Sequence, residues 1–284
     1  MTEAPQAARS SSELAKRIVS GVVMIAAALL AAWIGGILFA VFWTVAGIAV
    51  GVEWAWLSSP DPKARRRAAQ TVALTLGVAG ALVGLAGYFA ISFWVIAAAL
   101  AIGAAAAALL ARPVYVTAAA VPYGAAVFIG VILLRRDPHD GLLATLWLFA
   151  VVWATDIAAY FTGRAIGGPK LAPRISPKKT WSGALGGAAA AACAGVAVAA
   201  LGGVGNLWPV ALIALITAVL AEAGDLLESG VKRAFGAKDS SQLIPGHGGL
   251  MDRLDGFLVA ATFVAAVGLA RGGLDGAGQG LLRW

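Results

Sequence analysis

Residues 208–230 read WPVALIALITAVLAEAGDLLESG. Apart from Thr217, residues 208–221 are apolar, and the carboxylates follow them. A helix needs about 20 such residues to cross a ~30 Å hydrocarbon layer at 1.5 Å per residue. The stretch therefore predicts a transmembrane helix with acidic groups near one end. An unpaired charge at the centre of such a helix costs roughly 2.5 kcal/mol or more, so these groups should line a cavity or bind something charged.

Similar apolar runs occur along the whole chain. Of its 284 residues, 61% are hydrophobic and 12% are charged, against roughly 25% charged in an average soluble domain. We therefore predict an all-α, polytopic membrane protein with about nine transmembrane helices and no large soluble domain. The predicted spans lie near residues 18–36, 37–57, 71–89, 91–111, 114–134, 141–163, 183–203, 208–230 and 252–270.

The distribution of basic residues predicts the orientation, because Lys and Arg in short loops are retained on the cytoplasmic side. Alternating the nine spans places Arg135, Arg136, Arg271 and Arg283 on one side and the other seventeen of the 21 Lys and Arg residues on the opposite side. We therefore predict a cytoplasmic N-terminus and an external C-terminus. The loops around 164–180 and 231–251 should then face the cytoplasm.

The eighth span should carry a polar face. Its residues Glu222, Asp225, Ser229 and Lys232 are spaced so that they fall within about an 80° arc of a helix, with Glu228 roughly 40° outside that arc. Two interpretations stay open: an ion-pair network that holds helices together, or carboxylate ligands for Mg²⁺, which prefers oxygen donors.

The ninth span begins with Asp252 and Asp255, which are i, i+3 neighbours at a helix N-terminus that favours anions. A metal shared with Asp225 would relieve their mutual repulsion. Before them lies Pro245-Gly-His-Gly-Gly249, whose glycines allow backbone N–H groups to approach phosphate oxygens. His247 in this loop either hydrogen-bonds its neighbours or contacts a substrate.

A second polar segment lies between the sixth and seventh spans. Asp156 and Tyr160 share one face of the sixth span, an expensive placement for a carboxylate unless it points into a cavity. Ser176-Pro-Lys-Lys-Thr180 then offers two ammonium groups and two hydroxyls. These lysines either clamp a polyphosphate as point charges or only flank two spans on the cytoplasmic side.

These motifs carry a resemblance. Ser229-Gly-Val-Lys-Arg233, Lys238-Asp239, Pro245-Gly-His-Gly-Gly249 and Asp252-Arg-Leu-Asp255 resemble the signature of the phosphatidate cytidylyltransferase family. Asp156-Ile-Ala-Ala-Tyr160 and Ser176-Pro-Lys-Lys-Thr-Trp-Ser-Gly183 resemble the second block of that family. The similarity covers about 120 residues, from Trp153 to the end of the last span.

The resemblance implies transfer of CMP from CTP to phosphatidate. It implies catalytic roles for Asp225, Asp252, Lys178 and Lys179. It implies Mg²⁺ bound by Asp225 and Asp252, with Asp255 as a further ligand, and it leaves a second cation open. The substrate-binding residues that it implies are Asp156, Ser176, Lys232, Arg233, Lys238, Asp239, His247, Gly248, Gly249 and Arg253. The acceptor phosphate is already ionised, so a strong general base is not required.

We accordingly divide the chain into a polar N-terminal segment (1–17), N-terminal transmembrane helices (18–140) and a catalytic transmembrane region with two cytoplasmic motif loops (141–284). The expected partners are CTP, phosphatidate and the lipid bilayer, with no nucleic acid. The resemblance implies a homodimer, and we expect it in a bacterial cytoplasmic membrane. The alternatives are a cytidylyltransferase for another lipid phosphate and an ion-coupled transporter.

Overall fold

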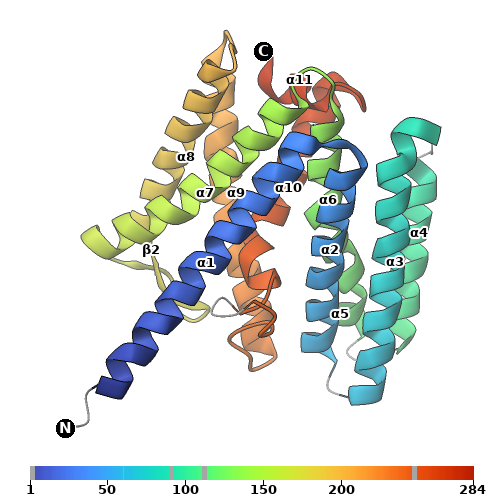
Figure 1. The fold of residues 1–284 in the computed structure, drawn as a ribbon, viewed down its shortest axis with the longest axis vertical. Coiled ribbons are helices and arrows are strands. Elements are labelled where there is room, and N and C mark those ends of the chain that lie inside the picture. The colour runs from blue at the N-terminus through green and yellow to red at the C-terminus, as the bar shows by residue number, and fades with distance from the viewer. Residues whose placement is uncertain (1–3, 60, 90–92, 111–113, 245–247) are drawn as a thin grey trace.

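The computed structural model describes residues 4–59, 61–89, 93–110, 114–244 and 248–284 and is almost entirely helical (Figure 1). The elements in chain order are α1 (Ala4–Ile34), α2 (Gly36–Ser58), α3 (Pro62–Phe89), α4 (Phe93–Leu110), α5 (Val114–Ala118), α6 (Ala120–Arg136), α7 (Gly141–Ile166), β1 (Lys170–Ala172), β2 (Ser176–Thr180), α8 (Trp181–Leu201), α9 (Leu207–Ala234), α10 (Met251–Gly272) and α11 (Ala277–Leu282).

Seven stretches of the described residues are long and apolar enough to cross a membrane: Gly36–Ser58, Pro62–Ala86, Val116–Arg136, Gly141–Ile166, Trp181–Leu201, Leu207–Ala234 and Met251–Gly272. The other two predicted spans coincide with the shorter apolar helices Ile18–Ile34 and Trp94–Leu109. The all-α, polytopic membrane class is thus confirmed. The number of crossings and the side of the N-terminus stay predictions.

Helix α3 begins nine residues before the predicted span at 71. Asp61 starts it, because its Oδ2 accepts a hydrogen bond from the backbone N–H of Ala64 at 2.7 Å. Pro62 follows as the first helical residue, a position where its missing N–H costs nothing. The basic residues after Pro62 are therefore the first turns of a helix that continues into the apolar span.

The segment between α7 and α8 forms a hairpin that the sequence analysis did not predict. Strands β1 and β2 pair antiparallel, with Lys170 opposite Thr180 and Ala172 opposite Ser176. Thr180 then caps α8, because its Oγ1 accepts a hydrogen bond from the backbone N–H of Gly183 at 3.1 Å. The two predicted lysines therefore lie on a short strand attached directly to a membrane helix.

Helices α7 and α8 pack through small residues. The buried positions of α8 recur every fourth residue and are all Gly or Ala: Gly183, Gly187, Ala191, Gly195 and Ala199. A Cβ added at Gly183 would lie 2.8 Å from the backbone oxygen of Ala159 on α7. Without side chains on this stripe the two backbones approach closely, as is common between helices in lipid. This contact fixes the hairpin relative to α7.

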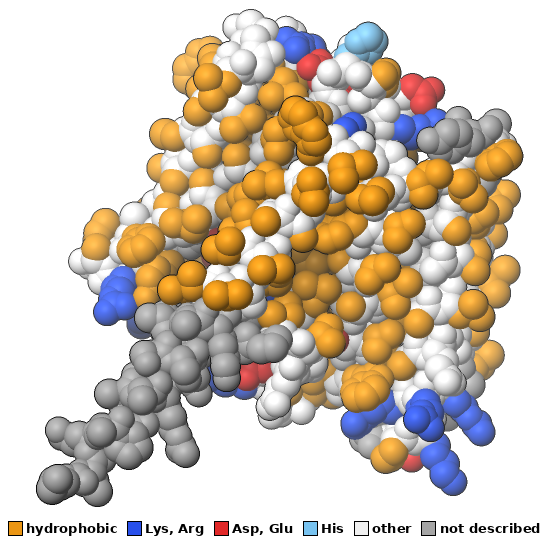
Figure 2. All heavy atoms as spheres, in the orientation of Figure 1, with side chains coloured by type: hydrophobic (Ala, Val, Ile, Leu, Met, Phe, Trp, Pro, Cys, Tyr) orange, Lys and Arg blue, Asp and Glu red, His pale blue; other side chains and the backbone are white. Residues whose placement is uncertain are grey.

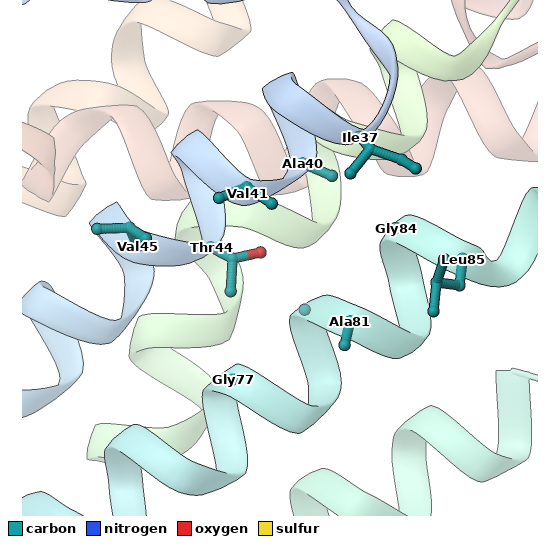
Figure 3. A pocket seen from close by; sticks show the side chains of 10 residues that line it. Ile37, Ala40, Val41, Thr44, Val45, Gly77, Ala81, Gly84 and Leu85 are labelled. Carbon is teal, nitrogen blue, oxygen red and sulfur yellow. The ribbon is translucent and has the colours of Figure 1, made fainter.

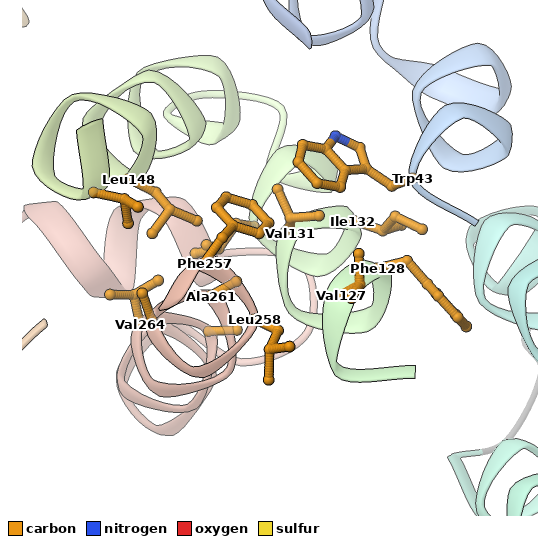
Figure 4. Close-up of a cluster of buried hydrophobic side chains, with 14 of the residues drawn as sticks. Trp43, Val127, Phe128, Val131, Ile132, Leu148, Phe257, Leu258, Ala261 and Val264 are labelled. Atoms are coloured by element: carbon orange, nitrogen blue, oxygen red, sulfur yellow. The ribbon is translucent and has the colours of Figure 1, made fainter. Parts of the chain in front are cut away.

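The core lies where α2, α6, α7 and α10 meet (Figure 4). Trp43 of α2 stacks on Phe257 of α10, with ring centroids 4.6 Å apart and planes 12° from parallel. Phe149 of α7 lies against both rings. The outer surface is apolar across the middle of the molecule, with charged side chains toward both ends (Figure 2). The N-terminal half of the chain therefore packs directly against the helix that carries Asp252 and Asp255.

A groove of about 270 Å³ lies between α2 and α3 (Figure 3). Ile37, Val41 and Thr44 line it from α2, and Gly77 and Gly84 line it from α3. The glycines have no side chain to fill the space, so the groove persists although the helices are in contact.

The end of the molecule opposite the hairpin is closed by the C-terminus (Figure 1). Arg283 makes a bidentate pair with Asp140, with Nε 2.9 Å from Oδ2 and Nη2 2.8 Å from Oδ1. The Asp140 side chain is 8% exposed and that of Arg283 is 43% exposed. Arg283 Nη1 also donates to the backbone oxygen of Gly203 at 2.8 Å. The Arg283 side chain thus connects the C-terminus to the turn before α7 and to the turn after α8.

Replacing Arg283 with Gln should lower the free energy of unfolding by about 1–3 kcal/mol, because a buried carboxylate loses its charged partner. The measurement is thermal unfolding in detergent. Arg136→Gln is the matched control, since Arg136 pairs with Asp275, whose side chain is 80% exposed, and exposed pairs contribute less than about 1 kcal/mol. Equal destabilisation by the two variants would contradict the role given to Arg283.

Candidate active site

Helices α9 and α10 approach each other closely at two glycines. A Cβ added at Gly224 would lie 2.6 Å from the backbone oxygen of Asp255, and one added at Gly256 would lie 2.9 Å from that of Ala221. Real Cβ atoms essentially never come that close, so any side chain at either position would push the helices apart. The contact holds the acidic end of α9 against the acidic start of α10.

Three carboxylates converge at this contact, and we call them the acidic cluster. Oxygen atoms of Asp225 and Glu228 from α9 and of Asp255 from α10 all lie within 4.8 Å of one another. Glu228 is fully buried, and its Oε1 has no hydrogen-bond partner among the described residues. Hard oxygen donors at this spacing suit a divalent cation, which would offset the repulsion between like charges.

Asp252, predicted as a metal ligand, lies beside the acidic cluster and has other partners. Its Oδ1 accepts a hydrogen bond from Lys232 Nζ at 2.6 Å. Its Oδ2 accepts from the backbone N–H groups of Ser240 at 3.0 Å and Gly249 at 2.9 Å. Lys232 Nζ also lies 2.6 Å from Glu228 Oε2. Lys232 therefore joins Asp252 to the cluster, and metal ligation by Asp252 stays a prediction.

Lys179 reaches the acidic cluster from strand β2. Its Nζ lies 2.6 Å from Glu222 Oε2 and 2.7 Å from Asp225 Oδ2. Burial lowers the pKa of Lys179, but the two carboxylates raise it by more, so the pKa ends above its ordinary value. Lys179 is therefore charged at neutral pH. Lys178, the preceding residue, is exposed.

Glu53 on α2 is a buried carboxylate that the sequence analysis did not single out. Its Oε1 accepts hydrogen bonds from Ser241 Oγ at 2.6 Å and from the backbone N–H of Leu250 at 3.0 Å. Its Oε2 accepts from Ser240 Oγ at 3.1 Å and from the backbone N–H of Met251 at 2.7 Å. We call the segment between α9 and α10 (residues 235–250) the motif loop. One carboxylate thus holds both Ser240-Ser241 of this loop and the start of α10.

One feature of the sequence could have identified Glu53: it is a single carboxylate within the predicted span 37–57. A carboxylate in a membrane span is costly unless its oxygens accept hydrogen bonds or pair with a charge. Glu228 was noted only as bordering the polar arc of α9, yet it is fully buried within the cluster. Glu222 was placed on that arc, and its contact with Lys179 agrees with the placement. The sequence analysis missed Glu53 because its hydrogen-bond partners lie almost 200 positions further along the chain.

The glycine-rich loop is partly described. Gly248 has a φ of +82°, a left-handed conformation that favours glycine. Its backbone oxygen accepts a hydrogen bond from the N–H of Ile244 at 2.8 Å, which closes the loop at its base. Gly249 is buried and binds Asp252. The predicted substrate contact His247 lies outside the described residues, together with Pro245 and Gly246.

The remaining predicted substrate-binding residues are mostly exposed. The exposed residues are Asp156, Arg233, Lys238, Asp239 and Arg253, and Ser176 is half-buried. Asp156 on α7 lies close enough to Glu222 and Asp225 for its charge to interact with both. Arg233 donates to the backbone oxygen of Ala237 at 3.1 Å. Within the described ranges, no ion pair shorter than 4.0 Å joins Lys178, Arg233 or Lys238 to the acidic cluster.

Comparison with known proteins agrees with this arrangement. A model of the cytidylyltransferase family matches residues 15–270. The chain is 41% identical over 257 residues to the phosphatidate cytidylyltransferase of Brucella suis biovar 1, which covers 90% of this chain and 94% of that protein. It is 43% identical over 144 residues to the phosphatidate cytidylyltransferase of Haemophilus influenzae, 47% of this chain and 50% of that protein. Since the family match extends over most of its length and includes every residue of the acidic cluster, the chain belongs to the cytidylyltransferase family.

Proposed function

We propose that this protein is a phosphatidate cytidylyltransferase of phospholipid biosynthesis, which transfers CMP from CTP to phosphatidate and releases pyrophosphate. The observation that carries the proposal is the 41% identity to a Brucella phosphatidate cytidylyltransferase over 90% of the chain. The acidic cluster beside Lys179 and Lys232 supports it, because both substrates are phosphates. Membership of the cytidylyltransferase family favours this enzyme over an ion-coupled transporter.

The reaction requires compensation of the negative charges on the two substrates and on the leaving pyrophosphate, and it does not require a strong general base. A phosphate oxygen of phosphatidate forms a bond to the α-phosphorus of CTP, and the bond from that phosphorus to the bridging oxygen of pyrophosphate breaks. The attacking oxygen is already ionised, so no proton must be removed from it. Catalysis then rests on bringing two anions together and stabilising the charge of the leaving pyrophosphate.

The acidic cluster fits a divalent cation, and we propose Mg²⁺ bound by Asp225, Glu228 and Asp255. Asp252, which shares Lys232 with Glu228, is the further candidate ligand. A bound Mg²⁺ supplies charge neutralisation at the substrate phosphates and at the leaving pyrophosphate. Magnesium commonly uses one or two protein carboxylates together with substrate phosphates, so the cluster does not need to complete the coordination by itself.

We propose that the basic residues around the acidic cluster bind the substrate phosphates. Lys179 and Lys232 are held at the cluster by carboxylates, where their ammonium groups can exchange a carboxylate partner for a phosphate oxygen. Lys178, Arg233 and Lys238 are exposed around this centre. We propose that they attract CTP and the lipid head group from solution and from the membrane surface, as long-range charge does for other anions.

The assay that tests the proposal uses purified protein in detergent with CTP, phosphatidate and Mg²⁺. We expect CDP-diacylglycerol and pyrophosphate to form. Asp225→Asn and Asp255→Asn should each lower kcat at least about 100-fold, because each removes a charged ligand of the cation. A chelator should abolish turnover, and added Mg²⁺ should restore it.

Asp275→Asn is the matched control, since Asp275 is exposed and lies just before α11, which is at the end of the molecule opposite the hairpin (Figure 1). It should change kcat less than about twofold. Full activity in the Asp225→Asn protein, or in metal-free buffer, would overturn the cation site. Transfer to a different lipid phosphate but not to phosphatidate would replace the proposed acceptor with that lipid.

Glu53→Gln tests whether the motif loop must be held in place for catalysis. An amide NH₂ cannot accept hydrogen bonds, so at least two of the four bonds at Glu53 are lost. We expect kcat to fall about 10- to 100-fold, as for other residues that orient a site without touching the substrate, with a smaller change in KM. Backbone hydrogen exchange at residues 240–251 should become faster.

Thr44→Val is the control for this substitution, because Thr44 is also a buried polar residue of α2 but lies in the groove away from the loop. It should leave both kcat and loop exchange within about twofold of the parent protein. An unchanged kcat in a folded Glu53→Gln enzyme would remove Glu53 from the positioning of the site.

We further propose that the enzyme is a homodimer in the bacterial cytoplasmic membrane, with its active site facing the cytoplasm. The dimer rests on the family resemblance, and the location rests on the seven apolar helices and the bacterial relatives. The hairpin and the motif loop lie at the end of the molecule that the basic residues predict to be cytoplasmic (Figure 1).

Single cysteines at the two ends test this orientation. In a Cys193→Ala background, Arg174→Cys should react with a membrane-impermeant thiol reagent only from the cytoplasmic side. Asp275→Cys should react only from the outside, and both positions are exposed. Labelling of Arg174→Cys from the outside would reverse the proposed topology.

A further inference from the structure

A second cavity lies at the same end of the molecule as the active site but on different elements. It has a volume of about 720 Å³ and lies between the C-terminal end of α2 and the start of α3. This size falls within the ~300–1,000 Å³ of typical ligand sites. Its lining includes Lys63, Arg65 and Arg66, and it contains none of the acidic-cluster residues.

The positive charge of this cavity is not balanced by nearby acids. None of the ion pairs within 4.0 Å in the described part of the chain involves its three basic residues. Asp61, the acidic residue next to them in sequence, is engaged in capping α3. Arg65 donates to the backbone oxygen of Ser59 at 2.8 Å, which fixes its side chain at the α2–α3 junction. Basic side chains are visible together at this end of α3 in Figure 2.

Apart from Gln70, the rest of the lining is apolar and belongs to α2 and α3. Val52, Ala69 and Ala73 form the inner wall, and Trp56, which is 54% exposed, stands beside them. Tryptophan is enriched where membrane proteins cross from lipid to head groups. The cavity thus combines three cations, an interfacial aromatic residue and a hydrocarbon-like wall at one membrane surface.

We propose that this cavity binds an anionic phospholipid, separately from the catalytic centre. The lipid phosphate would lie among Lys63, Arg65 and Arg66, and the acyl chains would follow Val52, Ala69 and Ala73. Basic pockets between transmembrane helices on the cytoplasmic side bind anionic head groups in this way. A soluble phosphate would leave the apolar wall and Trp56 without a partner, which is why we assign a lipid.

The experiment titrates delipidated full-length protein in detergent with phosphatidylglycerol or phosphatidylcholine and counts bound lipid by native mass spectrometry. Phosphatidylglycerol should bind more tightly than phosphatidylcholine. Arg66→Gln should weaken phosphatidylglycerol binding about fivefold, the effect of one basic residue near an anionic head group. Ala73→Phe, which narrows the cavity without changing charge, should also weaken it.

Arg67→Gln is the matched control, because Arg67 is the adjacent exposed arginine of α3 and does not line the cavity. It should change binding less than about twofold. An equal loss in Arg66→Gln and Arg67→Gln would show diffuse surface attraction and overturn the site. Equal binding of the two lipids, or displacement of phosphatidylglycerol by millimolar glycerol 3-phosphate, would also overturn it. The readout is binding, so its outcome is independent of cytidylyl transfer.

Discussion

Negative charge is concentrated where α9 meets α10, and the groups packed around this contact have to compensate it. Asp225, Glu228 and Asp255 converge there, and Glu222 and Asp252 lie next to them. Carboxylates so close together in a poorly solvated place must be compensated or neutralised. Lys179 and Lys232 each bridge two of these carboxylates. The three carboxylates of the acidic cluster could also hold a metal ion.

Compensation comes from backbone groups as well as from lysines. Asp252 accepts hydrogen bonds from the backbone N–H groups of Ser240 and Gly249, and Glu53 accepts them from those of Leu250 and Met251. The first N–H groups of a helix lack intrahelical acceptors, so carboxylates placed there stabilise the start of α10. The described part of the motif loop therefore donates to two carboxylates, and Gly249, which has no side chain, lets the backbone approach both of them.

The sequence predicted local features of this site better than long-range ones. Helical periodicity placed Glu222, Asp225 and Lys232 on one face of α9, and the structure shows each of them engaged in the charge network. The hairpin of residues 170–180 was not predicted, because its strands are short and Ser176-Pro-Lys-Lys-Thr180 lacks an alternating apolar pattern. The contact between Glu53 and the motif loop could not be derived, since periodicity describes single helices and carries no information on which helices pack together.

Glu53 also changes how the N-terminal helices are understood. The sequence analysis treated residues 18–140 as transmembrane helices with few functional residues, separate from a catalytic region that begins at 141. The structure shows that residues 240–251 donate four hydrogen bonds to Glu53 of α2, and that Trp43 of the same helix stacks on Phe257 of α10. At 100° per residue, Val52 and Trp56 lie about 40° apart on α2, and Glu53 lies about 60° beyond Trp56 on the adjacent face. The last turns of α2 therefore contact the motif loop and the cavity lined by Lys63, Arg65 and Arg66 through adjacent faces. A shift of α2 would reach both places, so the N-terminal helices are a structural part of the site.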